Sequence, residues 1–195
     1  LTELGMKPAD SWKDCQQQLV TRNFSYLPLE KFCPELQQII DLRPLLGLRS
    51  PVHTLVRLLN PLNADTSLQS VFHPAYSDTH HQAAQLLGQK NAAVFKGEGG
   101  EVECRPYADI AVKRIYQHQT DHYSIKRTLS QAEEIPVGSK VLTALWEENE
   151  SNPQGLETVL ATTAVALHTM GIEENFQTAK EKARQLWDKR SSTIN

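Results

Sequence analysis

The residues with the clearest chemical potential lie between Asn91 and Arg105, in the stretch NAAVFKGEGGEVECR. The short apolar run Ala92–Phe95 is typical of a buried strand. Lys96 follows, and then glycine occupies three of the four positions of Gly97–Gly100, which permits positive φ angles and close backbone approach. Strands of α/β proteins that end in such loops often carry a ligand beyond their carboxyl ends. A plain turn with solvated charges is the alternative that so short a pattern leaves open.

Four predicted elements position this stretch. Leu68–Phe72 alternates like a strand, Pro74–Leu87 has the apolar spacing of a helix, and Ala92–Phe95 is the second strand. A strand, a helix and a strand in this order predict a parallel pair with a right-handed crossover. The β-branched and aromatic residues of Ala111–Gln117 predict a further strand, and the alternation from Val102 onward predicts that the chain re-enters the sheet soon after the glycines.

Helices are predicted on both sides of this unit from apolar spacing and capping residues. They are expected at 11–20, Cys33–Leu46, Ser50–Leu59, Lys140–Asn149, Leu156–Met170 and Glu174–Lys189, with an extended segment over 23–29. The sequence therefore predicts the α/β class: a central, mostly parallel sheet with helices on both faces and a helical C-terminal end. A single domain over residues 1–195 accommodates these elements.

Composition limits the classes of protein and partner. A net charge of −3 argues against an overall basic nucleic-acid binder and leaves a local basic face open. The three cysteines are far apart without a CxxC motif, so free thiols and a cytoplasmic location are the simplest expectation. No run approaches the roughly 18 apolar residues of a membrane span, so no membrane partner is expected.

Several segments, in order along the chain, resemble those of anthranilate phosphoribosyltransferase and its relatives. They are RPLLGLRS (Arg43–Ser50), the Asn-Pro pair after Leu59, QAAQLLG (Gln82–Gly88) and KGEGGEVE (Lys96–Glu103). In that family an R-x-x-L-G-x-R-T segment precedes a helix ending in Asn-Pro, and a strand ends in His-Gly-x-Gly-Leu-Asp-Glu. The likeness runs over nearly all of the chain and implies a nucleoside phosphorylase/phosphoribosyltransferase-like α/β domain.

The resemblance assigns an acceptor site and a metal site. Arg43 matches the arginine that holds the carboxylate of anthranilate, a task that suits the forked guanidinium; an ordinary ion pair near a helix end is the alternative. The family's Asp-Glu pair, which binds Mg²⁺ on the diphosphate, falls on Glu101 and Val102. One carboxylate is therefore lost unless Glu103 substitutes for it after a shift.

Two basic residues separate this chain from the family pattern. Lys96 stands where the family has a histidine, and Arg57 lies in the helix that the family writes Asn-Leu-Leu-Gly-Pro. KGEG and SPVHTLV are more similar to bacterial anthranilate phosphoribosyltransferase-like proteins that bind nucleic acid, are dimeric and have no established transferase activity. The ligand-binding set that this resemblance implies is Arg43, Arg49, Arg57, Lys96, Gly97 and Gly99.

The family's diphosphate cradle, a Gly-Thr-Gly-Gly-Asp loop, lies N-terminal to the segments matched here, as does its small helical domain. The chain is therefore expected to be a C-terminal portion that lacks both. Glu98 places a carboxylate inside the remaining glycine loop, which makes that loop a poor replacement cradle for phosphates.

Basic residues are concentrated between Cys104 and Thr128. Against Asp109 and Asp121 stand five bases, Arg105, Lys113, Arg114, Lys126 and Arg127. The tyrosines at 107, 116 and 123 are interleaved with them and offer rings on which the bases of a single strand can stack. A solvated face of strands and loops is the alternative interpretation.

Two functions follow from these expectations. The first is a catalytically degenerate, homodimeric, cytoplasmic protein that binds a phosphate-bearing ligand, with nucleic acid as the expected partner. The alternative is a phosphoribosyltransferase of which this chain is a fragment, acting on phosphoribosyl diphosphate and anthranilate or a similar acceptor. Only a working transferase would need Mg²⁺, held at Glu101 and Glu103, and the chain alone is not expected to be competent.

Overall fold

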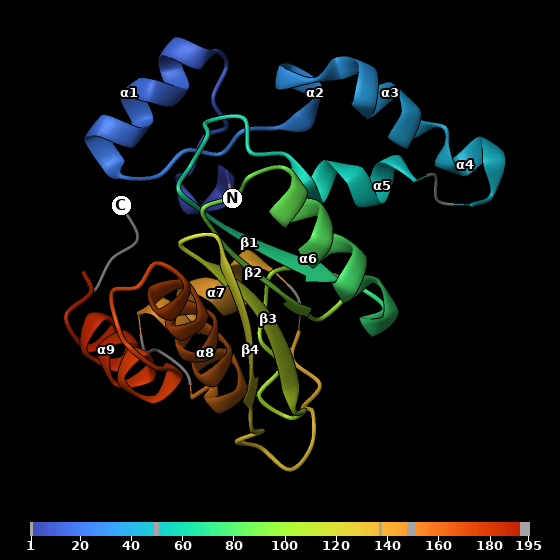
Figure 1. The fold of residues 1–195 in the computed structure, drawn as a ribbon. Coiled ribbons are helices and arrows are strands. Elements are labelled where there is room, and N and C mark those ends of the chain that lie inside the picture. Colours follow the sequence, from blue (N-terminus) through green and yellow to red (C-terminus); the bar gives the residue numbers. More distant parts are fainter. Residues whose placement is uncertain (1, 49–50, 137, 148–150, 192–195) are drawn as a thin grey trace. The chain divides into compact units, whose positions relative to one another are not determined.

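The computed structural model describes residues 2–48, 51–136, 138–147 and 151–191 (Figure 1). The chain divides into two compact units. The first is formed by the described residues of 1–57 and 137–147, and the second by those of 58–136 and 148–191.

The first unit is helical. Its described elements are a 3₁₀ turn, η1 (Thr2–Leu4), and the helices α1 (Trp12–Arg22), α2 (Leu29–Phe32), α3 (Pro34–Asp41), α4 (Arg43–Leu46), α5 (Val52–Leu55) and α7 (Ser139–Trp146). The Ser11 hydroxyl caps α1 by accepting a hydrogen bond from the backbone N–H of Asp14 at 3.1 Å. The segment before α2 is extended as expected, since the N–H of Ala9 donates to the carbonyl of Tyr26 at 2.8 Å.

The helix predicted over Cys33–Leu46 is divided into α3 and α4. Pro44 lacks a backbone N–H and its ring crowds the preceding turn, which explains why a regular helix stops at Asp41 and a short one restarts at Arg43. Gly47 ends α4 in the left-handed conformation, with φ of 66°.

The second unit contains a sheet of β1 (Thr66–Val71), β2 (Asn91–Lys96), β3 (Ile110–Tyr116) and β4 (Gln119–Ile125), in the order β1-β2-β3-β4. β1 and β2 are parallel, and α6 (Ser77–Leu86), preceded by the 3₁₀ turn η3 (Pro74–Tyr76), connects them. The predicted strand–helix–strand unit is therefore confirmed.

The sheet is mixed, so the expected parallel pairing holds for β1 and β2 alone. β3 runs antiparallel to β2 and to β4. β3 and β4 form a hairpin through Gln117 and His118, whose φ angles of 49° and 65° match a two-residue turn of the primed type. Residues 97–109 form a loop, so the expectation that the chain re-enters the sheet at Val102 was wrong.

Helices cover both faces of this sheet, which confirms the α/β class. On one face Ala84 of α6 packs with Ala92 and Ile115. On the other, α8 (Pro153–Thr169) packs its Ala161 and Val165 against Phe95 and other strand residues, and α9 (Phe176–Asp188) lies along α8 (Figure 1). β2 is buried on both faces, which is why Ala92–Phe95 is uniformly apolar.

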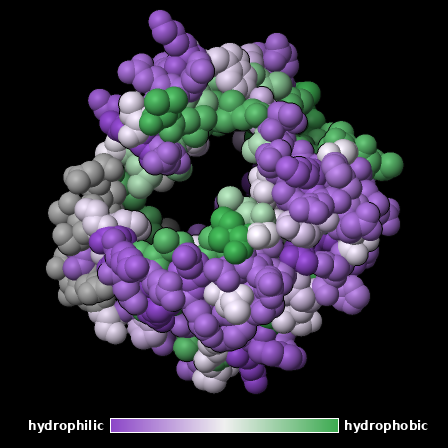
Figure 2. All heavy atoms as spheres, turned by 60° about the vertical axis from the view of Figure 1, so that its left-hand side comes forward, coloured by the Kyte–Doolittle hydropathy of each residue, from purple (hydrophilic) through white to green (hydrophobic). Residues whose placement is uncertain are grey.

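The C-terminal helices predicted over Leu156–Met170 and Glu174–Lys189 correspond to α8 and α9. None of the helices in the described part of the chain has the length and apolar character that crossing a bilayer requires. The face drawn in Figure 2 is mostly hydrophilic, with separate apolar groups among the polar side chains.

Candidate ligand-binding edge of the sheet

The ends of three strands meet at one edge of the sheet in the second unit. Val71 at the end of β1 pairs with Lys96 at the end of β2, so Phe72 and Gly97 leave the sheet side by side. The end of β4 lies at the same edge, because Ile125 pairs with Ile110 at the start of β3 and Phe95 pairs with Val112. We call residues 72–76, 96–109 and 126–129 the carboxyl edge. Ligands of α/β proteins commonly bind at such an edge.

The glycines of the loop after β2 meet two different requirements of the backbone. Gly97 donates its N–H to the buried Ser70 hydroxyl at 3.0 Å, and a Cβ at this position would lie 1.9 Å from the carbonyl oxygen of Glu101. Gly99 and Gly100 have φ of 56° and 87°, a region in which side chains other than hydrogen are strained. The close approach and the positive φ that the sequence predicts are thus both confirmed.

Glu98 turns its carboxylate back onto the loop. The Tyr107 hydroxyl donates to Oε2 at 2.5 Å, and the N–H of Gly99 donates to Oε1 at 3.3 Å. The hydrogen bond from Tyr107 is the main cause that lowers the pKa of Glu98, with smaller contributions from Gly99, Arg105 and Lys96. Burial, and then the bond to Glu98, raise the pKa of Tyr107 to about 12. The loop therefore holds a fixed negative charge at neutral pH.

Three cations of the carboxyl edge are Lys96, Arg105 and Arg127, of which the first two lie near Glu98. Lys96 donates from Nζ to the carbonyl of Phe72 at 2.6 Å and lies 5.2 Å from the centre of the Phe72 ring. Arg105 has a buried Nε, and within the described residues it finds no hydrogen-bond partner. Arg127 is exposed.

Backbone hydrogen bonds join the segments that carry Arg105 and Arg127. The N–H groups of Thr128 and Leu129 both donate to the carbonyl of Pro106, at 2.7 and 2.9 Å. The residues next to Arg105 and Arg127, Pro106 and Thr128, are thus directly bonded although they are 22 positions apart in the sequence. Neither guanidinium has an ion pair in the part of the chain that the structure describes.

The other predicted bases are neutralised. Lys126 pairs with Asp109 at 2.8 Å, and this bond is the main cause that lowers the pKa of Asp109. Lys113 pairs with Asp78 of α6 at 2.5 Å. Arg114 makes a forked contact with Asp121, which lowers the pKa of that carboxyl.

Lys113 and Arg114 also lie on opposite faces of the sheet, as neighbours in a strand must. Lys113 reaches α6 on one face, whereas Arg114 donates to the carbonyl of His168 in α8, at 3.1 Å, on the other. The five bases predicted as one nucleic-acid face are therefore divided: Arg105, Lys126 and Arg127 lie at the carboxyl edge, and Lys113 and Arg114 lie within β3.

The tyrosines between these bases are divided as well: Tyr116 and Tyr123 lie on the same face of the sheet as Arg114, and Tyr107 lies at the carboxyl edge. Tyr123 packs on the rings of His168 and Phe176, with centroids 5.1 and 6.1 Å away, and burial raises the pKa of its hydroxyl. Tyr116 lies under the guanidinium of Arg114, and Tyr107 is bonded to Glu98.

A group of aromatic side chains at the carboxyl edge escaped the sequence reasoning. Phe72, His73 and Tyr76 directly follow β1, and their rings contact one another, with centroids 4.7 Å apart for Phe72 and His73 and 6.3 Å for His73 and Tyr76. The signal was present in the sequence as FHPAY, which begins at the last residue of the predicted strand Leu68–Phe72 and so lies at the strand's carboxyl end.

The remaining predicted residues lie elsewhere. Arg43 is the exposed first residue of α4, and Arg57 lies in the 3₁₀ turn η2 (Val56–Leu58); both belong to the first unit. Arg49 lies outside the described residues. Glu101 and Glu103 are exposed on the loop, and the described residues include no group of three or more His, Cys, Asp or Glu side chains arranged to hold a metal.

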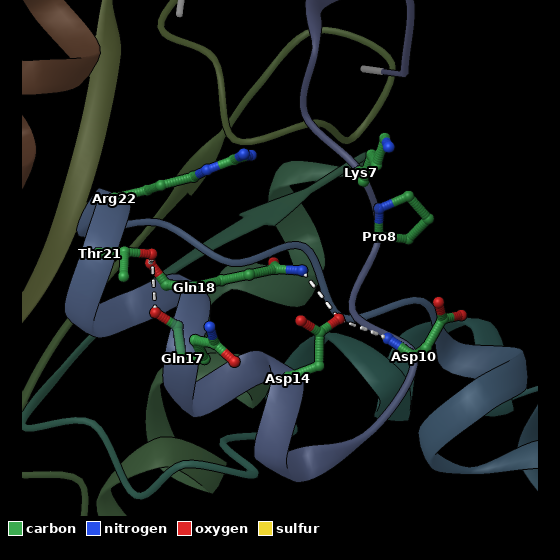
Figure 3. A pocket seen from close by; sticks show the side chains of 8 residues that line it. All are labelled: Lys7, Pro8, Asp10, Asp14, Gln17, Gln18, Thr21 and Arg22. Atoms are coloured by element: carbon green, nitrogen blue, oxygen red, sulfur yellow. Dashed lines mark hydrogen bonds between the residues drawn. The ribbon is translucent and has the colours of Figure 1, made fainter.

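The first unit has a cavity of its own, of about 270 Å³, between the segment Lys7–Asp10 and α1 (Figure 3). Asp14 points into it and accepts hydrogen bonds from the N–H of Asp10 at 3.1 Å and from the side chain of Gln18 at 3.0 Å. These bonds close the start of α1, so a structural function accounts for the polar groups.

The fold and the carboxyl edge define an α/β domain with a glycine loop at the end of a parallel strand pair. The model of the family described as "Glycosyl transferase family, a/b domain" matches residues 1–191, and the chain belongs to this family. An uncharacterized protein of Aquifex aeolicus is 33% identical over 95 residues, which are 49% of this chain and 31% of that protein. Anthranilate phosphoribosyltransferase of Pyrococcus furiosus is 25% identical over 194 residues, covering 95% of this chain and 59% of that enzyme.

Solved structures show the same fold. Anthranilate phosphoribosyltransferase from Saccharomyces cerevisiae in complex with PRPP and Mg superposes with a TM-score of 0.73 at 18% identity, covering 94% of this chain and 56% of that chain. The chain thus spans little more than half the length of this enzyme and of its Pyrococcus relative.

Proposed function

We propose that this domain binds a phosphate-bearing ligand at the carboxyl edge, that the ligand is nucleic acid, and that the chain alone transfers no phosphoribosyl group. The observation that carries the proposal is the position of Glu98. Its exposed carboxylate is held against the glycine loop by hydrogen bonds from the Tyr107 hydroxyl and the Gly99 N–H. A diphosphate in that loop would meet a fixed negative charge, which repels it.

Cations outside the loop remain for phosphates. Arg105 and Arg127 lie on segments that backbone hydrogen bonds join, and neither guanidinium forms an ion pair in the described part of the chain, although Glu98 and Asp109 are near enough for these charges to lower their pKa values. Guanidinium groups bind phosphate oxygens in a forked manner. An extended polyanion can reach both groups without entering the loop. The edge also carries four carboxylates, those of Glu98, Glu101, Glu103 and Asp109, so the binding should be weak and strongly weakened by salt.

Phosphoribosyl diphosphate with Mg²⁺ is the second candidate ligand. The exposed carboxylates of Glu101 and Glu103 favour it, because hard Mg²⁺ prefers carboxylate oxygens, and the relative from Saccharomyces cerevisiae has been solved with PRPP and Mg. Two exposed carboxylates on one loop are fewer ligands than Mg²⁺ requires, so water and the ligand's own phosphates would have to supply the others.

The test measures binding and turnover on the same preparation. Fluorescence anisotropy of a labelled single-stranded oligonucleotide, over a range of salt concentrations, gives the slope of log affinity against log salt. Each phosphate contact contributes roughly 0.7 to this slope for a single strand, so Arg105→Gln with Arg127→Gln should flatten it by about 1.4. Formation of phosphoribosyl anthranilate from phosphoribosyl diphosphate, anthranilate and Mg²⁺ should stay at buffer background.

A matched variant controls for net charge. Lys90→Gln with Lys113→Gln removes the same two charges from lysines that are already paired, with Asp65 and Asp78. This variant should keep the original slope. Absence of oligonucleotide binding at low salt, or equal slopes for the two double variants, would contradict nucleic-acid binding at this edge, and measurable turnover would support the transferase alternative. Light scattering of the same sample tests the homodimer that belongs to this proposal.

A further inference from the structure

We infer that Phe72, His73 and Tyr76 form a stacking platform for the bases of single-stranded nucleic acid. This inference rests on the proposed function and deepens it, because the cations of the carboxyl edge can hold phosphates only, whereas the three rings would hold bases. The platform is defined by these three residues and lies within one short segment, so it needs no contribution from the first unit.

The position of the platform follows from the strand pairing. Phe72 is the first residue after β1, and His73 precedes the turn η3, at whose end Tyr76 lies. The ring planes of Phe72 and His73 are nearly perpendicular, at 87°, and those of His73 and Tyr76 are inclined by 59°. The three rings therefore form one aromatic cluster at the carboxyl edge, in which neighbouring rings meet edge to face or at a tilt.

This cluster is exposed although its residues are large and apolar. Phe72 is 45% exposed and Tyr76 is 55% exposed, whereas Phe95 in the adjacent strand is fully buried. Folding gains little from side chains left in water, since the hydrophobic contribution scales with the apolar area that is removed from it. Neighbouring exposed rings of this kind are typical of a surface that contacts a ligand.

Cations beside the rings indicate a charged aromatic ligand and not an apolar one. Lys96 donates to the carbonyl of Phe72 at 2.6 Å and its Nζ lies over the Phe72 ring, 5.2 Å from the centre, so a positive charge is fixed on one of the rings of the platform. Sites that bind single strands without sequence preference combine aromatic rings, on which the bases stack, with cations that bind the phosphates. At this edge both components come from loops that leave adjacent, paired strands.

The experiment separates bases from phosphates. A labelled oligothymidylate of roughly twelve nucleotides, within the usual site size of roughly 4 to 16, is compared with an abasic oligomer of equal length. Loss of one stacked base weakens binding by roughly fivefold to 150-fold, so Phe72→Ala with Tyr76→Ala should weaken thymidylate binding by at least roughly thirtyfold. The salt slope should stay unchanged, and the double variant should bind the abasic oligomer as the unaltered protein does.

Phe24→Ala is the matched control, because Phe24 is 44% exposed and lies in the first unit. It should bind both oligomers like the unaltered protein, and circular dichroism should show that all variants are folded. If the unaltered protein binds thymidylate and the Phe72/Tyr76 variant binds it equally well, the platform is refuted and the proposed function stands. If the unaltered protein binds neither oligomer at low salt, the proposed function itself fails.

Discussion

Replacing Gly97 by alanine tests whether the glycine loop is held by close backbone approach. The added Cβ would lie 1.9 Å from the carbonyl oxygen of Glu101 and 2.6 Å from the Ser70 hydroxyl. The nearer obstacle is main chain and cannot rotate away, so the loop must shift. Overpacking of this kind costs about 1–3 kcal/mol, and the buried bond from the Gly97 N–H to Ser70 contributes about 0.5–1.5 kcal/mol that the shift would lose.

The expected loss of unfolding free energy is therefore about 2–4 kcal/mol, measured by urea-induced unfolding followed by circular dichroism. Two variants identify the cause. In Gly99→Ala the added Cβ has no atom within 4 Å, so the loss of unfolding free energy should be only the roughly 1–2 kcal/mol that an alanine costs in the left-handed region. Ser70→Ala added to Gly97→Ala should not restore stability, because the Glu101 carbonyl still obstructs the Cβ. A Gly97→Ala variant as stable as the unaltered protein, or more stable than Gly99→Ala, would refute this reasoning.

Three further predictions concern other contacts of the second and first units. Because the pKa of Glu98 is lowered, its bond with Tyr107 stabilises the fold above the ordinary pKa of 4.5, and this stabilisation is lost as the pH falls through the lowered value. Tyr107→Phe should therefore be less stable than the unaltered protein at neutral pH, and the difference should vanish in acid. Urea titrations at several pH values would show this. Arg114→Lys should lower stability by about 1.5–3 kcal/mol in urea titration, because lysine cannot make the forked contact with Asp121, and an unchanged midpoint would contradict the importance of this pair. A thiol reagent at neutral pH should modify the half-buried Cys33 and spare the two buried cysteines until the chain is unfolded, a difference that mass spectrometry would reveal.

The parts of the fold that could be predicted are those in which local pattern and tertiary contacts agree. The uniformly apolar run of β2 reflects burial on both faces, and the apolar spacing of α8 and α9 reflects their packing against the sheet and each other. β4 escaped prediction because five of its seven residues are exposed and polar, so no alternation marks it. Its turn, Gln117-His118, also lacks the Asn-Gly or Asp-Gly pair by which a tight hairpin is usually recognised.

The candidate site was predicted where its chemistry is local and missed where it depends on distant partners. Glycine at 97, 99 and 100 predicts a local property of the backbone, either a positive φ or a close approach. The structure shows a close approach at Gly97 and a positive φ at Gly99 and Gly100. The ion pair of Lys113 joins it to Asp78, 35 positions away, and nothing in the local sequence distinguishes that lysine from an unpaired one. A count of charges along the chain therefore overestimates the positive charge that a ligand would meet.

Strand geometry explains which of the counted bases remain for a ligand. Successive side chains of a strand point to opposite faces, so Lys113 and Arg114 are separated by the sheet and each meets the helix that covers its face. Bases in the loops at strand ends are not divided in this way. Arg105 and Arg127 follow β2 and β4 and lie at one edge because those strands end there, as does β1, which the aromatic segment follows. The carboxyl edge of the second unit brings rings and cations from separate segments together because the ends of these strands converge there.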